Sequence, residues 1–125
     1  MDLATIKAQI EKSREFEESY AGAKFRLRLP SEHYWRLITE DHMDSEGRVQ
    51  NARAARKLLE AALIGWEGLT AEHLLKGAGE QAVPYSSEAI SLLLDERGDV
   101  VDHLAKLLVR KLGARRAQQE ASRKN

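Results

Sequence analysis

Apolar residues recur at three- and four-residue intervals along most of this 125-residue chain, which is the spacing of amphipathic helices. The clearest stripe predicts a helix over residues 48–64, whose inner face carries alanines that would let a neighbouring element approach closely. Another stripe, ending at Leu112, predicts a last helix that starts at Val100. Three weaker patterns predict helices over residues 2–19, 32–41 and 86–97, the second with Ser31 as its N-cap and the third with Ser86 or Ser87.

Two segments depart from the helical pattern. Residues 24–29 alternate polar and apolar side chains, which is the period of a strand, and residues 66–85 form a long connection that contains several glycines. We therefore predict an all-α or nearly all-α fold, with four or five helices in one domain over residues 1–112 and at most one short strand at 24–29. Residues 113–125 are polar and basic and are expected to form a frayed C-terminal tail.

Composition excludes several classes of protein. Apolar residues make up 42% of the chain and charged residues 32%, which is too charged for a membrane protein and too apolar for a disordered one. No apolar run approaches the roughly 18–20 residues that a spanning helix needs, so no membrane association is expected. The chain has no cysteine, which excludes a disulfide framework and a thiolate zinc site.

The formal net charge is zero, which argues against a general nucleic-acid binder, but the charge is unevenly distributed. Residues 106–125 hold seven basic residues and one acidic residue, a net charge of +6, so the first 105 residues carry −6. The basic residues are Lys106, Arg110, Lys111, Arg115, Arg116, Arg123 and Lys124. They fit a solvated helix end, where cations oppose the helix dipole, and the alternative is a segment that steers an acidic partner.

Every candidate catalytic or ligand-binding motif in the sequence lacks a residue or a spacing that it requires. Residues 42–47 resemble the start of a calcium loop, but Arg53 stands where the bidentate glutamate is needed. The segment 77–79 lacks the further glycine and lysine positions of a phosphate-binding loop, and the four histidines show no metal-binding i, i+4 pair. The helices over 48–64 and 86–97 are too far apart for a helix-turn-helix. We expect no enzyme activity, metal or cofactor, although a catalytic site assembled only in three dimensions stays open.

Residues 53–97 carry the most distinctive pattern in the chain. A helix is followed by Gly65-Trp66-Glu67-Gly68, then by Val83-Pro84-Tyr85-Ser86, then by a short helix with Leu92-Leu93-Leu94. This succession resembles the tail assembly chaperones of long-tailed, siphovirus-like bacteriophages. The resemblance covers about 45 residues and depends chiefly on Gly65, Trp66, Gly68, Pro84 and Tyr85.

The same residues also have a purely structural interpretation. Gly65 is expected to end the preceding helix, because glycine accepts the positive φ of a helix C-terminus. Trp66 is then expected to fold back as a buried apolar plug against the helix that Gly65 ends and against the 86–97 helix. Gly68 permits a further tight turn, and Pro84 stiffens the approach to the next helix. On this interpretation, Trp66 and Tyr85 build the fold whatever the protein does.

The resemblance implies a function in the host cytoplasm. Chaperones of this family bind the tape measure protein and keep it soluble until tail-tube protein polymerises around it. Tail-tube protein and a second copy of the chain are further expected partners. Apolar helix faces would supply the binding surface, and the candidate residues are Ala52, Ala55, Leu59, Val101, Leu104 and Leu108.

Two alternatives remain at this point. One is a small phage-encoded inhibitor or adaptor that binds a host protein complex, which a clustered acidic face on residues 1–105 would favour. The other is a small enzyme, which a deep pocket with converging carboxylates or histidines would favour.

Overall fold

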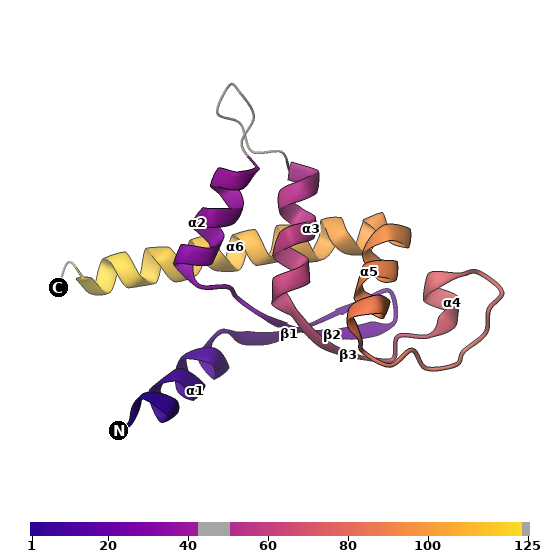
Figure 1. Cartoon of the computed structure of the whole chain (residues 1–125), viewed down its shortest axis with the longest axis horizontal. Coiled ribbons are helices and arrows are strands. Elements are labelled where there is room, and N and C mark those ends of the chain that lie inside the picture. The colour runs from indigo at the N-terminus through magenta and orange to yellow at the C-terminus, as the bar shows by residue number, and fades with distance from the viewer. Residues whose placement is uncertain (43–50, 124–125) are drawn as a thin grey trace.

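The computed structural model describes residues 1–42 and 51–123, and these residues form six helices and three strands (Figure 1). In chain order the elements are α1 (Leu3–Ser13), β1 (Glu15–Tyr20), β2 (Ala23–Arg28), α2 (Glu32–Asp41), α3 (Asn51–Ala62), β3 (Leu63–Glu67), α4 (Ala71–Leu74), α5 (Ser87–Glu96) and α6 (Gly98–Arg123). The prediction of an all-α fold is wrong, because the three strands form one antiparallel sheet in the order β1-β2-β3. The fold is mixed α/β.

The first two strands form a hairpin where the sequence pattern predicts a helix through residue 19. Tyr20 pairs with Ala23, so the turn consists of Ala21 and Gly22 alone, and both have positive φ, 53° and 86°. Positive φ at both central residues is the requirement of a type I′ hairpin turn. Phe16 and Tyr20 are four residues apart, which fits a helix face, and also an even number apart, which fits a strand face. Residues 15–20 form a strand because they pair with β2.

The third strand replaces the expected end of a helix. The helix predicted over 48–64 is α3, which ends at Ala62, while its predicted start at residue 48 and most of the polar segment 42–47 lie outside the described residues. Gly65, expected as the helix-ending glycine, lies within β3 and pairs with Arg26 next to a register shift. The positive φ instead belongs to Gly68, at 75°. Gly68 also lies close to the hairpin, because an added Cβ would stand 3.3 Å from the carbonyl oxygen of Gly22.

Other elements follow their sequence signals closely. The alternating segment predicted over 24–29 is β2, and α2 has the predicted bounds. The Ser31 hydroxyl accepts a hydrogen bond of 3.1 Å from the backbone amide of Tyr34, and the Ser86 hydroxyl accepts one of 3.0 Å from that of Ala89. Ser31 is therefore the expected N-cap of α2, and of the two serines predicted for α5, Ser86 is the N-cap.

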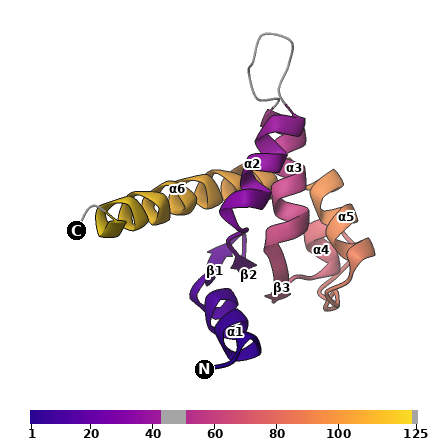
Figure 2. The same ribbon diagram turned by 60° about the vertical axis from the view of Figure 1, so that its left-hand side comes forward.

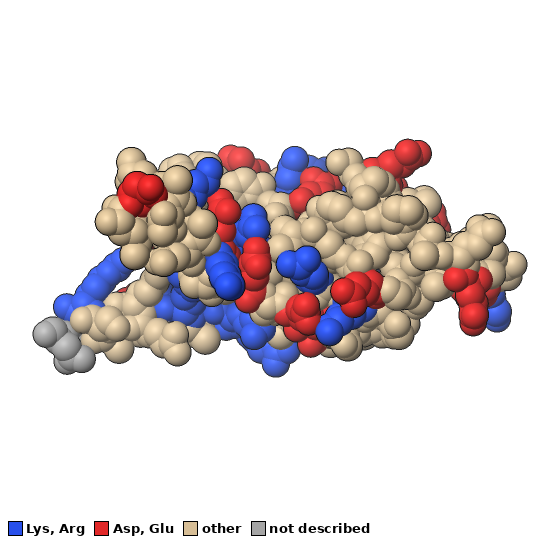
Figure 3. Space-filling model, turned by 90° about the horizontal axis from the view of Figure 1, so that it is seen from below, with Lys and Arg blue, Asp and Glu red and all other residues tan. Residues whose placement is uncertain are grey.

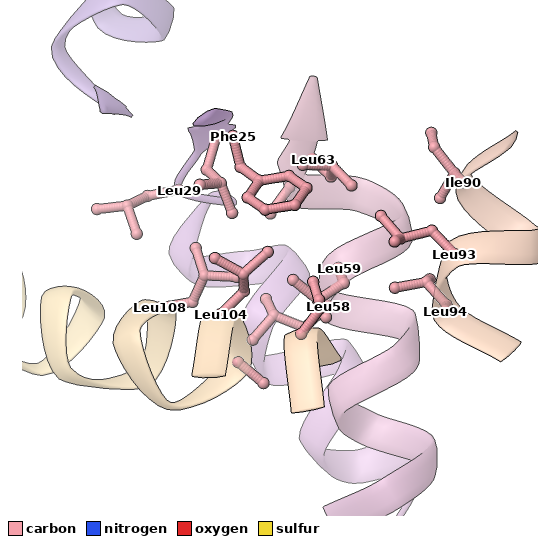
Figure 4. Close-up of a cluster of buried hydrophobic side chains, with 14 of the residues drawn as sticks. Phe25, Leu29, Leu58, Leu59, Leu63, Ile90, Leu93, Leu94, Leu104 and Leu108 are labelled. Carbon is pink, nitrogen blue, oxygen red and sulfur yellow. The ribbon is translucent and has the colours of Figure 1, made fainter. Parts of the chain in front are cut away.

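One face of the sheet and the helices share the hydrophobic core. Phe25 and Leu27 of β2 contribute side chains that are almost fully buried, and they join leucines from α3, α5 and α6 in a single cluster. Figure 4 shows these side chains converging between the sheet and the helices. The largest fully buried side chains are Phe25, Leu27, Leu58, Leu59, Leu63, Leu69, Leu93, Leu104 and Leu108, together with Val100.

The opposite face of the sheet carries paired charges. Glu15 binds Arg28 at 2.7 Å, and Glu17 binds Lys24 at 3.1 Å, in both cases between neighbouring strands. Such cross-strand pairs let one face of an antiparallel sheet stay in water. On the side of the molecule seen in Figure 3, basic and acidic side chains are accordingly interspersed.

The two ends of the described chain are helical. Helix α6 continues through Gly113 to Arg123, so residues 113–123, expected as a frayed tail, extend this helix. Its last turns project past α2 in both ribbon views (Figures 1 and 2). At the other end, α1 buries none of its residues, and its apolar stripe of Leu3, Ile6 and Ile10 is exposed.

Candidate protein-binding groove between α3 and α6

An open groove of about 1070 Å³ runs between α3 and α6. Ala52 and Ala55 of α3 line one side, and residues of α6 line the other. Trp35 of α2 and Leu94 of α5 also contribute to the lining. Helix α3 crosses α6 in both ribbon views (Figures 1 and 2), so the groove brings together helices that are about 40 residues apart in the chain.

The α6 wall is a regular stripe of small apolar residues. Val101, Ala105 and Val109 follow one another at four-residue intervals, which places them on one side of the helix. The neighbouring face, which contains Leu104 and Leu108, enters the core and is fully buried. Val109 is 48% exposed although it is apolar. Val109 and the half-buried Val101 therefore offer apolar surface to a ligand, while Ala105 between them is buried, with 8% of its surface exposed.

The structure divides the predicted binding residues into two groups. Three of them, Ala52, Ala55 and Val101, line the groove and keep exposed or half-buried side chains. The other three, Leu59, Leu104 and Leu108, have no exposed surface and belong to the core. Sequence periodicity identifies apolar helix faces, but it does not show which part of a face another element covers.

Several groove residues were missed by the sequence pattern. Ala105 and Val109 lie beside the main stripe of α6. Trp35 belongs to α2, which precedes α3 in the chain. The four-residue spacing from Val101 to Val109 was the available signal. It was hidden because Leu104, Leu108 and Leu112 form a stronger stripe on the same helix.

Charged side chains edge the groove. Arg56 is fully engaged, because it donates to Glu60 at 3.0 Å, to Ser91 at 3.1 Å and to Asp95. The hydrogen bond to Asp95 raises the pKa of Arg56 above its ordinary value, with a smaller contribution from Glu60. This cluster ties α3 to α5 beside the groove.

On the α6 side, Asp102, Lys106 and Arg110 form a second stripe parallel to the apolar one. All three are exposed. Lys106 and Arg110 make no ion pair with any residue of the described ranges 1–42 and 51–123. The groove thus has a largely apolar lining beside an exposed stripe of one acidic and two basic side chains.

The two segments that carry the family resemblance lie against each other. The indole Nε1 of Trp66 donates to the carbonyl oxygen of Val83 at 2.7 Å, and the Tyr85 hydroxyl donates to the carbonyl oxygen of Leu63 at 2.9 Å. The rings of Trp66 and Tyr85 meet edge to face, with centroids 5.1 Å apart. Trp66 is half-buried, and these contacts hold the 83–85 segment on β3.

A polar cluster joins the hairpin to the first turns of α6. Nε2 of His103 lies 2.7 Å from Oε2 of Glu18, and its ring stacks on Tyr20 with centroids 4.3 Å apart. The Tyr20 hydroxyl and Arg97 both donate to Asp99. Each of these side chains already has a partner, so the cluster is best explained as a link between β1 and α6.

The described residues contain no cluster of three or more His, Asp or Glu side chains that could hold a metal ion. Within the same part of the chain, no helix combines the length and apolarity that crossing a membrane requires. Comparison with protein-family models, with curated proteins and with solved structures finds no match to this chain.

Proposed function

We propose that this protein binds a helical segment of another protein in the α3–α6 groove, and that it serves as a tail assembly chaperone for the tape measure protein in the host cytoplasm. The observation that carries the proposal is the groove itself, which gathers Ala52, Ala55 and Val101 from two distant helices. The choice of partner follows from the resemblance of residues 53–97 to tail assembly chaperones.

The groove suits reversible binding of a helix. Alanines on both walls leave room for a helix backbone to approach, and helix-in-groove recognition uses apolar anchors spaced three and four residues apart. Val109 and Trp35 supply larger apolar contacts at the surface. A chaperone that must release its client needs such a shallow, open site, because a deeply enclosed ligand would dissociate slowly.

The distribution of charge favours a chaperone over an inhibitor that imitates nucleic acid. Such an inhibitor needs acidic side chains gathered on one face, whereas Glu15 and Glu17 are each paired with a basic residue on the outer face of the sheet. The face in Figure 3 likewise carries both signs of charge. An enzyme would need converging polar groups, and the described groove lining contains one carboxylate, Asp102, and one imidazole, His103.

The test is co-expression with the tape measure protein from the same genome. The full chain should co-purify with that protein and increase its soluble fraction. Val109→Asp should abolish both effects, because it places a charge on the apolar stripe. Leu92→Asp is the matched control, since Leu92 is an exposed apolar residue of α5, 45% exposed, that does not line the groove.

Two results would contradict the proposal. If the full chain neither co-purifies with the tape measure protein nor keeps it soluble, the chaperone function is wrong. If Val109→Asp and Leu92→Asp lose binding equally, the groove is not the site. Light scattering of the purified variants at the working concentration separates self-association from partner binding.

A further inference from the structure

From the charges along the groove we infer that its ligand is an acidic amphipathic helix. The apolar face of this helix would lie on Val101, Ala105 and Val109, and its carboxylates would lie against Lys106 and Arg110. The inference rests on the proposed function in one respect, that the groove binds a helical segment, and it adds the chemistry of that segment.

The geometry of α6 sets the length of the contact. Val101 and Val109 are eight residues apart, which corresponds to about 12 Å along a helix axis. A ligand helix lying along the groove would therefore meet the stripe over about two turns. Ala55 faces the same space from α3, so the ligand would bury apolar side chains against both walls.

The charges run beside this apolar stripe with the same spacing. Asp102, Lys106 and Arg110 are four residues apart, so a ligand on the stripe would have all three along one flank. Lys106 and Arg110 have no ion-pair partner in the described ranges, whereas Arg56, the other basic residue of the groove lining, is paired with Glu60 and Asp95. Complementary charge at these two positions would come from the ligand.

The helix dipole does not account for these two cations. Favourable interaction of a cation with the dipole falls off within the last turn of a helix. Because α6 extends to Arg123, Arg110 lies 13 residues before its last residue and Lys106 lies further away still. The dipole explanation applies to Arg123 and does not extend to Lys106 and Arg110.

Two synthetic helical peptides provide the probe. Both carry the same face of leucine and alanine, and one has glutamates along its flanks where the other has lysines. Fluorescence anisotropy measures the Kd of each peptide for the full chain. We expect the glutamate peptide to bind about three- to tenfold more tightly at low salt, since two exposed ion pairs contribute modestly. The preference should shrink at high salt.

The decisive variant is Lys106→Glu combined with Arg110→Glu, which should reverse the preference between the peptides. The matched control, Lys76→Glu with Arg123→Glu, makes the same change of charge at exposed residues that do not line the groove and should leave the preference unchanged. Circular dichroism establishes that each variant is folded.

The outcomes separate this inference from the proposed function. Equal binding of the two peptides, a preference for the lysine peptide, or no binding of either peptide overturns the inference. If the chain captures the tape measure protein but fails the peptide test, the chaperone function stands and the acidic-helix inference is wrong. If the chain prefers the glutamate peptide, and this preference reverses in the double variant, but the chain does not capture the tape measure protein, the inference stands and the choice of partner is wrong.

Discussion

The indole Nε1 of Trp66 donates a hydrogen bond of 2.7 Å to the carbonyl oxygen of Val83, 17 residues further along the chain. The bond joins β3 to the segment that leads into α5, and the Tyr85 ring completes the contact from the same side. A sequence motif that resembles a functional signature thus has a structural role in this chain: it closes the connection between a strand and a helix.

We expect Trp66→Phe to lower the free energy of unfolding by about 1–2 kcal/mol, because the ring is largely retained while the carbonyl of Val83 loses its donor. Tyr85→Phe should cost about 1 kcal/mol through the lost bond to Leu63. Urea unfolding followed by circular dichroism measures both. An unchanged stability in Trp66→Phe would show that this hydrogen bond does not hold the segment.

Acid should weaken the link between the hairpin and α6 through Asp99. Hydrogen bonds from Arg97, and then from the Tyr20 hydroxyl, hold the pKa of the Asp99 carboxyl well below its ordinary value. A carboxyl whose pKa is lower in the folded state stabilises the fold above its unfolded pKa, about 3.9, and this contribution is lost as the pH falls below that value. Stability should therefore decline below about pH 4.

Asp99→Asn should reduce this acid dependence and should also lower stability at neutral pH. Some dependence should remain, because Arg28 lowers the pKa of Glu15, and the backbone amides of Gly77 and Gly79 lower that of Glu72. Melting temperatures measured between pH 2.5 and 7 test the prediction, with Glu80→Gln on the exposed loop as the control. The same acid slope in Asp99→Asn as in the native chain would contradict it.

Substitution by alanine should change the free energy of unfolding in opposite directions at two glycines. Gly113 lies inside α6, and nothing stands within 4 Å of an added Cβ, so Gly113→Ala should stabilise the helix by about 0.5–1 kcal/mol. Gly68 has a φ of 75° and a close neighbour in Gly22, so Gly68→Ala should destabilise the protein by about 1 kcal/mol or more. Thermal melts followed at 222 nm measure both changes. No gain from Gly113→Ala would indicate that the helix frays before residue 113 in solution.

Substitutions at two adjacent residues of α6 should have different effects, one on the stability of the protein and the other on ligand binding. Leu108 is fully buried, so Leu108→Ala should cost about 2–5 kcal/mol. Val109 is half-exposed in the groove, so Val109→Ala should change stability by no more than about 0.5 kcal/mol while weakening capture of the ligand. Unfolding curves and peptide binding are measured on the same preparations. If Val109→Ala destabilises the protein as much as Leu108→Ala, the groove wall is part of the core.

The elements that the sequence predicts well have their signals within a few residues of one another. Ser31 and Ser86 cap α2 and α5 as expected, since each serine bonds to an amide three residues later. The apolar stripe of α6 and the alternation of β2 are likewise local. These features could be predicted because the interactions that create them lie inside the element itself.

What the tertiary structure alone decided is the sheet and the groove. Trp66 continues the apolar spacing of α3 and Gly65 is expected to end that helix, yet both residues pair with β2, about 40 residues earlier in the chain. Ala55 and Val101 face one space only because α3 crosses α6. A helix forms its backbone hydrogen bonds within one segment, whereas a strand needs a partner from elsewhere and a groove needs two walls. Local periodicity therefore determined most of the helices of this protein, and long-range pairing and packing determined where the sheet forms and which helix faces remain open.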